Sequence, residues 1–381
     1  MEIYFDHAAT TVVSEQAVKR VWEVMEKDYG NPSSLHQKGL EAEAYLKKSR
    51  ESIAKALKVL PQEVYFTSGG TESNNLSLIG LARAKKRQGK HIVVSSIEHA
   101  SVIQAAKYLE NEGFNVSYLP VSSKGMVEID TLQAALTKDT ILVSIMHVNN
   151  ELGSIQNIKK LCACVKTFHS QIVFHTDAVQ SFGKIEIFPK LWGIDILSLS
   201  GHKLGAPKGV GVIFIREGVR LVPLIYGGGH EQGLRSGTEN VPGIAGLWGA
   251  VEEVFSDFDG RYKKVLDLKQ YAMECLKEIE KVVIHSDLKD YSPYVLNISC
   301  IGVRSEVLLH ALAEKGIYVS AASACSSHGK KGNTVLQNIK LPQKEIDSAI
   351  RLSFSIGNTK EEVDYFTQQC KAILLKLRRF Q

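Results

Sequence analysis

The stretch that decides the fold is DILSLSGHKLGAPKGVGVIFI, residues 195–215. Two apolar, β-rich runs, ILSLS (196–200) and VGVIFI (210–215), flank a loop that contains Gly, His, Lys and Pro. Short runs that are apolar on both faces are typical of buried strands in an α/β sheet. His202 and Lys203 stand where the first strand is predicted to end. Most lysines at such places are solvated loop residues. The alternative is an amine held at the end of a sheet because it does chemistry, and this stretch alone leaves both open.

Runs of the same kind recur through the first two-thirds of the chain. Further short, β-rich runs lie at 64–69, 91–96, 116–121, 141–146 and 172–177. Helix-like apolar spacing is found at 14–27, 38–58 and 72–86. Buried strands that alternate with helices predict α/β architecture with a largely parallel central sheet.

The pattern changes near Phe255. A charged helix at 260–281 leads to β-rich runs with helices between them, which is typical of a smaller α+β domain. The predicted fold is therefore α/β: a large domain with a mainly parallel central sheet flanked by helices, plus a smaller α+β domain. We expect the large domain to span 14–255 and the small domain to comprise 1–13 and 256–381.

Composition excludes several classes of protein. The chain has 381 residues with 46 basic and 41 acidic side chains, a small excess that is dispersed along the sequence. No long basic run indicates nucleic-acid or membrane binding. No stretch approaches a membrane span, and the start lacks the layout of a signal peptide. Six cysteines are few for a disulfide scaffold, and Cys162-Ala-Cys164 is not a zinc-type spacing. We expect a cytoplasmic protein without a metal site.

Polar residues follow five of the predicted strands. Ligands of an open α/β sheet bind at the carboxyl ends of its strands. In chain order, the residues at those ends are Gly69, Gly70 and Thr71, then Glu98 and His99, then Asn149 and Asn150, then Asp177 and Gln180, and finally Ser200, His202 and Lys203. Convergence of five strand ends predicts a binding site.

The chemistry of these residues indicates a phosphorylated aromatic cofactor. SGGTESNN (68–75) places two glycines and a Thr between a strand and a helix, where free N–H groups bind phosphate, although a plain turn has the same pattern. Asp177 ends an apolar strand, either in a structural ion pair or beside a protonated ring nitrogen. His99 is either an interior histidine or a ring that stacks on a cofactor. Together with Lys203, these are the parts needed to hold pyridoxal phosphate through a Schiff base.

The sequence resembles cysteine desulfurases of the NifS/IscS type, within the class-V aminotransferase group of fold-type-I pyridoxal-phosphate enzymes. The resemblance spans nearly the whole chain. It rests on YFDHAATT, GNPSSLH, SGGTESNN, EHASV, NNELG, HTDAVQ, SLSGHKLGAPKGVG, RSGTEN, SACSS and IRLSFS.

The resemblance implies a role for each cofactor residue. Lys203 would be the Schiff-base lysine, Asp177 would pair with the pyridinium nitrogen and Gln180 would contact the ring hydroxyl. His99 would stack on the ring and shuttle protons, and Asn149 would lie beside the ring and the substrate. The residues implied to hold the phosphate are Gly70, Thr71, Ser200 and His202, with Thr238 reaching the phosphate of a neighbouring subunit in a homodimer.

It also implies the substrate residues and the reaction. Arg351 would grip the substrate carboxylate, which suits its two-pronged donor geometry. Cys325 would accept sulfur from L-cysteine as a persulfide, with alanine as the product, and pass it to an acceptor protein. His328 and Lys330 are placed to lower the pKa of the Cys325 thiol. The loop that carries Cys325 is expected at about 320–333.

Two departures from the family leave the sulfur acceptor open. SAASACSS has Ala-Ala where many relatives have Thr-Gly, and the chain ends at KLRRFQ without the longer tail of some members. Iron–sulfur cluster assembly, tRNA thiolation and cofactor synthesis all stay possible destinations. Selenocysteine lyase, another pyridoxal-phosphate lyase and an aminotransferase are the alternatives of the same fold. A non-catalytic phosphate-binding module is the alternative of another class, but it leaves Asp177, Lys203 and Arg351 without roles.

Overall fold

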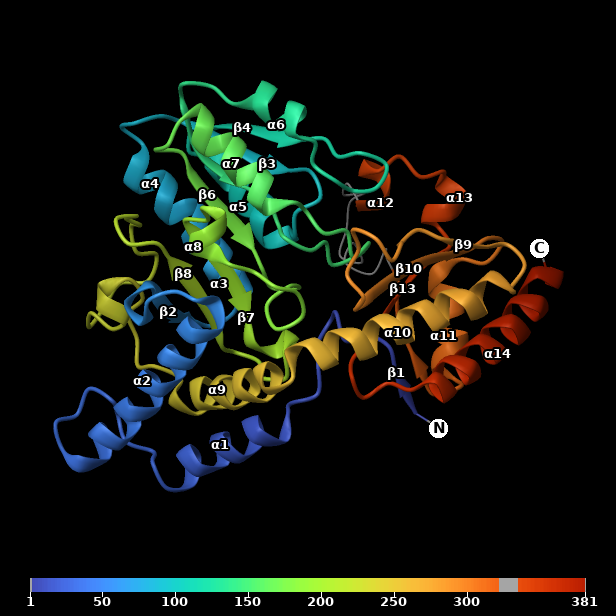
Figure 1. Cartoon of the computed structure of the whole chain (residues 1–381), viewed down its shortest axis with the longest axis horizontal. Helices are drawn as coiled ribbons and strands as arrows, with labels where there is room; N and C mark the ends of the chain where they lie inside the picture. Colours follow the sequence, from blue (N-terminus) through green and yellow to red (C-terminus); the bar gives the residue numbers. More distant parts are fainter. Residues whose placement is uncertain (1, 322–334, 381) are drawn as a thin grey trace.

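The computed structural model describes residues 2–321 and 335–380. Its largest sheet has seven strands in the order β2-β8-β7-β6-β5-β3-β4. Their bounds are β2 Val64–Thr67, β3 His91–Ser95, β4 Asn115–Leu119, β5 Thr140–Ser144, β6 Val173–Asp177, β7 Ile196–Ser200 and β8 Gly211–Ile215. Each overlaps a run that the sequence predicts as a strand, and β4 and β5 begin one residue before the predicted run. Figure 1 shows this sheet with helices on both of its faces.

Alternate residues of the sheet enter two separate cores, which explains the continuous apolar runs. Phe174 and Leu197 pack on one face against α1 (Glu15–Glu26), α2 (Gln37–Leu57), α7 (Ile158–Phe168) and α9 (Val241–Ser256). Val173 and Ile196 pack on the other face against α5 (Ala100–Asn111) and the helical stretch that follows β2. The predicted α/β class with a mainly parallel, doubly covered sheet is confirmed.

One strand runs against the others. β8 is antiparallel to both β7 and β2, whereas β3–β7 pair in parallel. Because β2 and β7 are both antiparallel to β8, β2 runs parallel to β7. The carboxyl end of β2 therefore lies at the same edge of the sheet as the carboxyl ends of β5, β6 and β7.

The helix predicted at 72–86 differs in detail. It begins two residues earlier and consists of α3 (Gly70–Asn75), a π-helical segment (Leu76–Gly80) and α4 (Leu81–Lys85). The chain at Val222 approaches closely here: its N–H donates to the carbonyl of Gly80 (3.0 Å), and a Cβ on Gly80 would lie 2.8 Å from the Val222 carbonyl oxygen. The wider π-helical turn, which ends at Gly80, accommodates the close approach of the chain at Val222.

The C-terminal third forms a four-stranded antiparallel sheet in the order β12-β13-β10-β9. Its strands are β9 Val282–Ile284, β10 Val295–Cys300, β12 Ser320–Ala321 and β13 Ala349–Ser353. The helices α10 (Phe258–Lys277), α11 (Ser305–Ala313) and α14 (Lys360–Leu377) cover it. The other helices in this part are the short α12 (Val335–Asn338) and α13 (Gln343–Ile346).

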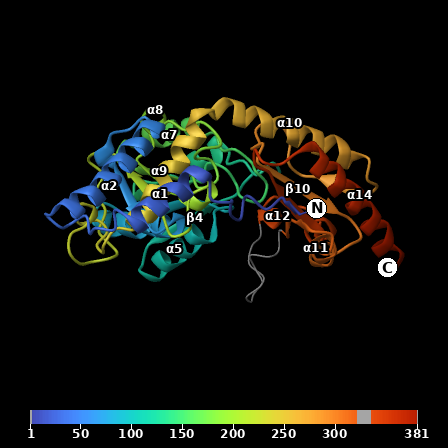
Figure 2. The same cartoon turned by 90° about the horizontal axis from the view of Figure 1, so that it is seen from below.

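The N-terminus belongs to this second sheet region. β1 (Ile3–Tyr4) pairs in parallel with β11 (Ile317–Tyr318), and Phe5 is fully buried in the core beneath the four-stranded sheet. Figures 1 and 2 show the start of the chain among the C-terminal elements, whereas α1 lies against α9. Residues 6–14 therefore cross from one sheet region to the other.

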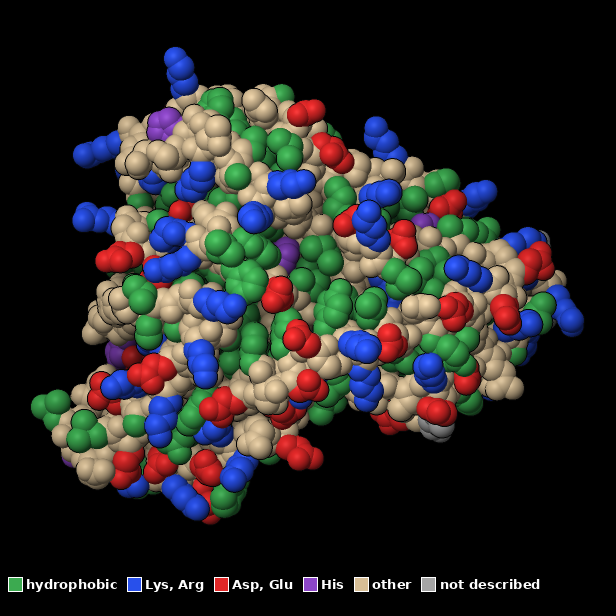
Figure 3. Space-filling model, in the orientation of Figure 1, with side chains coloured by type: hydrophobic (Ala, Val, Ile, Leu, Met, Phe, Trp, Pro, Cys, Tyr) green, Lys and Arg blue, Asp and Glu red, His purple; other side chains and the backbone are tan. Residues whose placement is uncertain are grey.

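Charges are mixed on the surface. Figure 3 shows Lys and Arg side chains interspersed with Asp and Glu across one face rather than gathered by sign. Among the helices of residues 2–321 and 335–380, none combines the length and apolar character that a membrane crossing requires.

Candidate active site

Lys203 lies at the carboxyl end of β7. The strand ends at Ser200, and one turn of 3-10 helix (Gly201–Lys203) turns the chain away from the sheet. The amine of Lys203 donates to the carbonyl oxygens of Ala8 (2.7 Å) and Ala9 (2.6 Å). The lysine side chain thus points to the segment that joins the two sheet regions.

That N-terminal segment is held from both sides. The N–H of Ala8 donates to Ser353 Oγ (2.8 Å) in β13, and Thr10 Oγ1 is 3.2 Å from His202 Nδ1. Asp6 forms an ion pair with Arg351 (2.7 Å). No site role was predicted from the sequence for Asp6, Ala8, Thr10 or Ser353. The available signal was YFDHAATT, in which Asp, His and Thr follow a short apolar run.

Asp177 ends β6 and is almost fully buried, with 4% of its surface exposed. Its Oδ1 accepts from the N–H of Val179 (2.9 Å), and its Oδ2 accepts from Asn74 Nδ2 (2.7 Å). The same amide nitrogen donates to Ser101 Oγ (2.9 Å), which lies 2.8 Å from His99 Nδ1. A chain of hydrogen bonds therefore connects two residues that the sequence predicts for the site.

His99 is the N-cap of α5, and its ring nitrogen Nδ1 accepts from the backbone N–H of Ser101 (3.2 Å). One edge of the ring is occupied by these contacts, while the side chain as a whole is exposed. Such a ring has a free face, which stacking on a cofactor requires.

Where the loop after β2 enters α3, close packing leaves no room for a side chain at Gly70. A Cβ on Gly70 would lie 2.7 Å from Val179 Cγ2 and 3.5 Å from Ser200 Cβ, and Gly69 has φ of +156°. The first N–H groups of a helix have no partner within the helix, and Thr71 is exposed beside them. Backbone donors, a threonine and Ser200 therefore surround a space that suits a phosphate group.

His202 is half-buried between cations. Burial, followed by the charges of Lys203, Lys208 and Lys184, lowers its pKa to about 4. A neutral His202 donates one hydrogen bond and accepts one, so it can donate to an anion without adding charge.

Gln180 and Lys184 extend the site behind the N-terminal segment. Gln180 Nε2 donates to the carbonyl of Ala8 (3.0 Å), and its Oε1 accepts from the amine of Lys184 (3.4 Å). Burial lowers the pKa of Lys184 to about 7, with Lys203 and Arg351 as the next causes. Lys184 was not predicted from the sequence, because it lies in a turn, in QSFGK, without a local motif.

Asn149 is fully buried, and its polar atoms are taken up by the turn after β5. Its Nδ2 donates to the carbonyl of Ile97 (3.0 Å), and its Oδ1 accepts from the N–H groups of Glu151 (2.9 Å) and Leu152 (2.8 Å). The side chain thus joins the turn after β5 to the segment before His99, and any contact with a ring would be a packing contact.

Arg351 reaches the site from the second sheet. It lies in β13, between Ser320 of β12 and Asn297 of β10. Its Nη1 donates to the carbonyl of Asn150 (2.8 Å), while Nη2 pairs with Asp6. Its buried Nε has no hydrogen-bond partner among the described residues. The Nε–H is therefore left for another acceptor.

Thr238 lies away from these residues. Thr238 is exposed in the loop before α9, next to Ser68 and Gly237 in a small pocket at the end of β2. Cys325, His328 and Lys330 lie outside the described residues.

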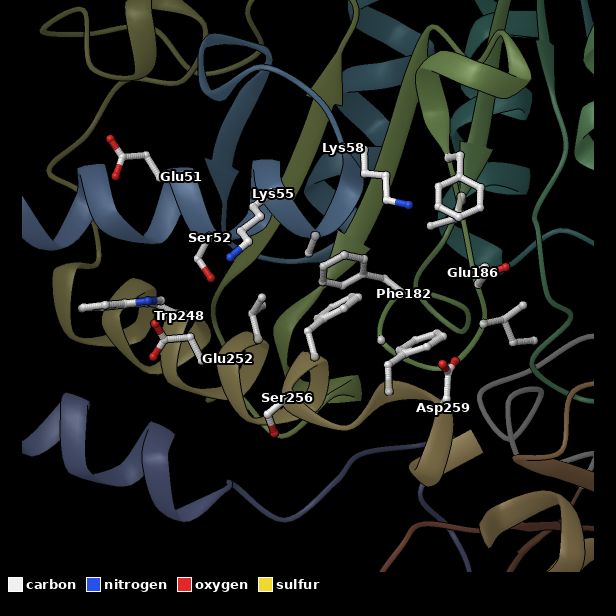
Figure 4. Close-up of a pocket in the computed structure, with 18 of the residues that line it drawn as sticks. Glu51, Ser52, Lys55, Lys58, Phe182, Glu186, Trp248, Glu252, Ser256 and Asp259 are labelled. Atoms are coloured by element: carbon white, nitrogen blue, oxygen red, sulfur yellow. The ribbon is translucent and has the colours of Figure 1, made fainter. Parts of the chain in front are cut away.

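A larger cavity of about 710 Å³ lies elsewhere, between α2 and α9. Figure 4 shows Lys55, Phe182 and Trp248 on its wall. None of the predicted site residues lines it. The volume of a cavity therefore does not identify the candidate site. The polar groups that lie together at the strand ends do.

The chain matches known proteins over nearly its whole length. Residues 3–366 match the model of the aminotransferase class-V family. The chain belongs to this family. It is 40% identical to a cysteine desulfurase IscS of Dictyoglomus turgidum over 99% of this chain and 95% of the relative. A solved NifS-like protein superimposes with a TM-score of 0.94 at 38% identity, covering 99% of this chain and 100% of that one.

A solved structure of SspA in complex with cysteine has a TM-score of 0.81 at 34% identity, covering 94% of this chain and 100% of the other. The similarity to IscS and NifS-like proteins thus extends over nearly the whole chain. The family resemblance that the sequence motifs indicate is confirmed.

Proposed function

We propose that this chain is a pyridoxal-phosphate-dependent cysteine desulfurase that converts L-cysteine to L-alanine and takes the sulfur onto Cys325. The observation that supports it most is the placement of Lys203, Asp177 and His99 at one edge of the large sheet, with Arg351 reaching them from the other sheet. Relatives named cysteine desulfurase are 40% and 41% identical to this sequence over 99% of the chain.

The residues present fit the cofactor. Gly70, Thr71, Ser200 and His202 would hold its phosphate, since the backbone there leaves no room for side chains and offers donors. Asp177 would pair with its ring nitrogen. The remaining ring contacts are assigned to His99, Gln180 and Asn149. When bound, pyridoxal phosphate supplies an electron sink next to the substrate Cα.

Lys203 would attach the cofactor and move the Cα proton. Its amine donates to the carbonyl oxygens of Ala8 and Ala9, which places it at the carboxyl end of β7 beside the N-terminal segment. Asp177 keeps its negative charge in place through two donors, Val179 N–H and Asn74 Nδ2. A fixed carboxylate stabilises the protonated ring nitrogen without needing to reorganise.

Arg351 would bind the substrate carboxylate. Asp6 and the Asn150 carbonyl orient the guanidinium, and Nε together with the second hydrogen of Nη2 forms a side-on pair of donors. A carboxylate accepts such a pair in two parallel hydrogen bonds.

The sulfur step requires a thiolate. The Cys325 thiolate attacks the sulfur of the substrate, an S–S bond forms as the C–S bond breaks, and the electron pair of the broken bond ends as a C–H bond of alanine after protonation. A free thiol has a pKa of about 8.5, so nearby positive charge favours this step.

Product analysis tests the reaction. We expect alanine and a protein persulfide from L-cysteine, whereas pyruvate and sulfide would indicate a lyase. A selenocysteine lyase would instead prefer selenocysteine strongly, because a selenol is ionised at neutral pH and depends less on a protein thiol.

The variant Cys325→Ala separates these alternatives. It should keep the cofactor and its yellow colour, because Lys203 and Asp177 are unchanged, yet alanine formation should fall to background. Cys164→Ala is the matched control, since that thiol lies in α7 away from the site. Alanine and sulfide produced by Cys325→Ala at the parent rate would show that the chain is a lyase.

We also propose a homodimer in which Thr238 reaches the cofactor phosphate of the partner. Thr238 is exposed, and large apolar side chains are exposed on α1 as well: Val18 (54%), Trp22 (56%) and Met25 (66%). Exposed apolar surface of this kind is typical of protein interfaces. A mass near 42.1 kDa in sedimentation equilibrium would contradict the dimer.

For the sulfur acceptor, we propose a class of protein. An acceptor protein in iron–sulfur cluster assembly, tRNA thiolation or cofactor synthesis would receive it in the cytoplasm. The five cysteines in the described residues are free thiols, which suits a reducing compartment. Incubation of the persulfide form with each class of purified acceptor, followed by counting of transferred sulfur, would identify the acceptor class.

For the domains, we propose 14–255 as the cofactor-binding domain and 1–13 with 256–381 as the smaller one. Separate cores under the two sheets support this division. Limited proteolysis that cuts elsewhere than near residue 256 would argue against it.

A further inference from the structure

We propose that Asn74 and Ser101 are positioning residues that fix Asp177 and His99 relative to each other and determine which nitrogen of His99 carries the proton. This inference rests on the proposed function, because it concerns how the same site holds pyridoxal phosphate. Neither residue touches the reacting atoms in the assignment above.

The direction of each hydrogen bond in the chain is determined. The backbone N–H of Ser101 can only donate, so His99 Nδ1 must accept (3.2 Å). An accepting Nδ1 carries no hydrogen, and Ser101 Oγ must therefore donate its hydrogen to the same atom (2.8 Å). Ser101 Oγ in turn accepts from Asn74 Nδ2 (2.9 Å). The proton of neutral His99 then lies on Nε2.

The amide of Asn74 has only one orientation that fits. Its Nδ2 donates one hydrogen to Ser101 Oγ and the other to Asp177 Oδ2 (2.7 Å). A flipped amide would place its oxygen against a carboxylate. The orientation leaves Asn74 Oδ1 buried with no hydrogen-bond partner among the described residues. A buried acceptor without a partner is unfavourable. Asn74 therefore contributes to the site through the two hydrogens that its Nδ2 donates.

The three linked elements are otherwise independent. Asn74 comes from α3, Ser101 from the first turn of α5, and Asp177 from the end of β6. Exposed fractions of 1%, 8% and 4% keep water out of the chain of bonds. A charge-bearing carboxylate and the imidazole are thus coupled through a dry path, which strengthens each bond.

Asn75 offers a matched control. It is the next residue of α3, and its Nδ2 donates to the carbonyls of Thr71 (2.8 Å) and Ser101 (3.5 Å). Among the hydrogen bonds of the described residues, its amide forms none with the side chain of Asp177 or His99. Asn74→Leu and Asn75→Leu therefore make the same chemical change, and only the first removes the two donors.

The first readout is the affinity of the cofactor-free protein for pyridoxal phosphate, measured by fluorescence titration. A hydrogen bond to a charged group accounts for on the order of 10-fold or more in an equilibrium constant. We expect Asn74→Leu to weaken binding by about 10-fold and Asn75→Leu to leave it unchanged. Equal affinity of both variants and the parent would overturn the role assigned to Asn74.

The second readout is the ¹⁵N spectrum of the imidazole nitrogens of the holo-protein, with His99→Gln to assign the His99 signals. The parent should show an unprotonated Nδ1 and a protonated Nε2. Ser101→Ala keeps the backbone N–H that donates to Nδ1, so Nδ1 should stay unprotonated, but loss of the hydroxyl donor should move the Nδ1 resonance away from its parent position. Ser101→Thr, which keeps the hydroxyl, should restore the parent position. Unchanged signals in Ser101→Ala would overturn the inference even if Asn74→Leu failed to fold.

These outcomes are distinct from failure of the proposed function. A parent protein that does not bind pyridoxal phosphate through Lys203 contradicts the proposed function. A parent that binds it while Asn74→Leu and Ser101→Ala behave like the parent contradicts only the inference.

Discussion

The two sheets contribute to the candidate site in different ways. The seven-stranded sheet presents residues at the carboxyl ends of its strands, so Asp177 and Lys203 are placed by rigid elements buried on both faces. The four-stranded sheet contributes Arg351 from the middle of a strand, and its guanidinium is oriented by Asp6 and Asn150 from outside that sheet. We therefore expect residues of the seven-stranded sheet to determine the cofactor chemistry. We expect the contact between the two sheets to determine the affinity for the substrate. Substitutions should therefore separate kcat from KM.

The largest effect is expected for Lys203→Ala in the first sheet. Loss of a general acid–base group alone costs about 10²–10⁴ in rate, and loss of the covalent link to the cofactor adds to that. Alanine formation should fall to background. Borohydride reduction and peptide mapping should find the pyridoxyl group on Lys203 of the parent and nowhere in the variant.

Lys208→Ala is the control for that variant, because Lys208 is an exposed lysine of the same loop. It should keep both the label and the activity. A pyridoxyl group on Lys208 or Lys184 in the parent would displace Lys203 from the centre of the site.

Asp177→Asn should follow in size, with kcat lowered by on the order of 10²–10³ and the fold retained. Steady-state kinetics with L-cysteine measure it. Asp195→Asn is a matched control, since Asp195 is another buried carboxylate of the same sheet but precedes β7 at the opposite edge, where it pairs with Lys166 and Arg216. It should lower stability rather than kcat. A kcat near the parent value in Asp177→Asn would mean that another group stabilises the ring charge.

The difference between the sheets also explains what could be predicted from the sequence. The strands were predictable because each is a short run buried on both faces, and their ends carry the polar residues in chain order. The reversed direction of β8 was not, because an antiparallel strand buried on both faces has the same apolar pattern. The π-helical turn before Leu81 depends on the distant Val222 and leaves no local signal.

Contacts between distant residues account for the site residues that sequence reasoning missed. Asp6 meets Arg351 across 345 positions, and Asn74 meets Asp177 across 103. The first pair follows from how the two sheet regions pack and the second from how α3 packs at the end of β6, and neither is visible in the periodicity of the sequence. Lys203 was predictable for the opposite reason: it directly follows a strand, so its place at the sheet edge is a local property.

A smaller effect, of a different kind, is expected for Arg351→Lys in the second sheet. The change keeps the positive charge but removes the pair of parallel donors, so KM for L-cysteine should rise by about 10-fold, the value of a hydrogen bond to a charged group. The value of kcat should stay within about three-fold, because the contact exists before and during the reaction. Arg378→Lys is the control, since Arg378 binds the carbonyls of Ile301 and Glu280 at the far end of the chain. A lowered kcat with unchanged KM would place Arg351 in the chemistry and remove the distinction between the sheets.

The smallest effect on catalysis is expected for two buried lysines, one in each region. Burial lowers the pKa of both Lys184 and Lys269 to about 7 from 10.5. Lys269 donates to two backbone carbonyls, of Asp287 (2.7 Å) and Ser292 (2.9 Å), whereas Lys184 has one long hydrogen bond to Gln180 and lies near two other cations. Lys184 is thus the less well compensated charge, and its replacement should stabilise the protein.

The sign of the pH dependence follows from these pKa values. Between pH 7 and 10.5 the unfolded chain holds the proton that the folded amine has lost, so stability rises with pH in that window; below pH 7 both states are charged and the cost of burying the ammonium is complete. Lys184→Met should therefore stabilise the cofactor-free protein most at pH 6, and its advantage should shrink by roughly 2 kcal/mol by pH 9. Equilibrium urea unfolding at both pH values measures this. Lys269→Met should destabilise at pH 9, because it leaves two buried carbonyls unpaired. If Lys184→Met showed the same advantage at both pH values, its effect would come from packing alone, and the amine would not be a buried charge at the junction of the two sheets.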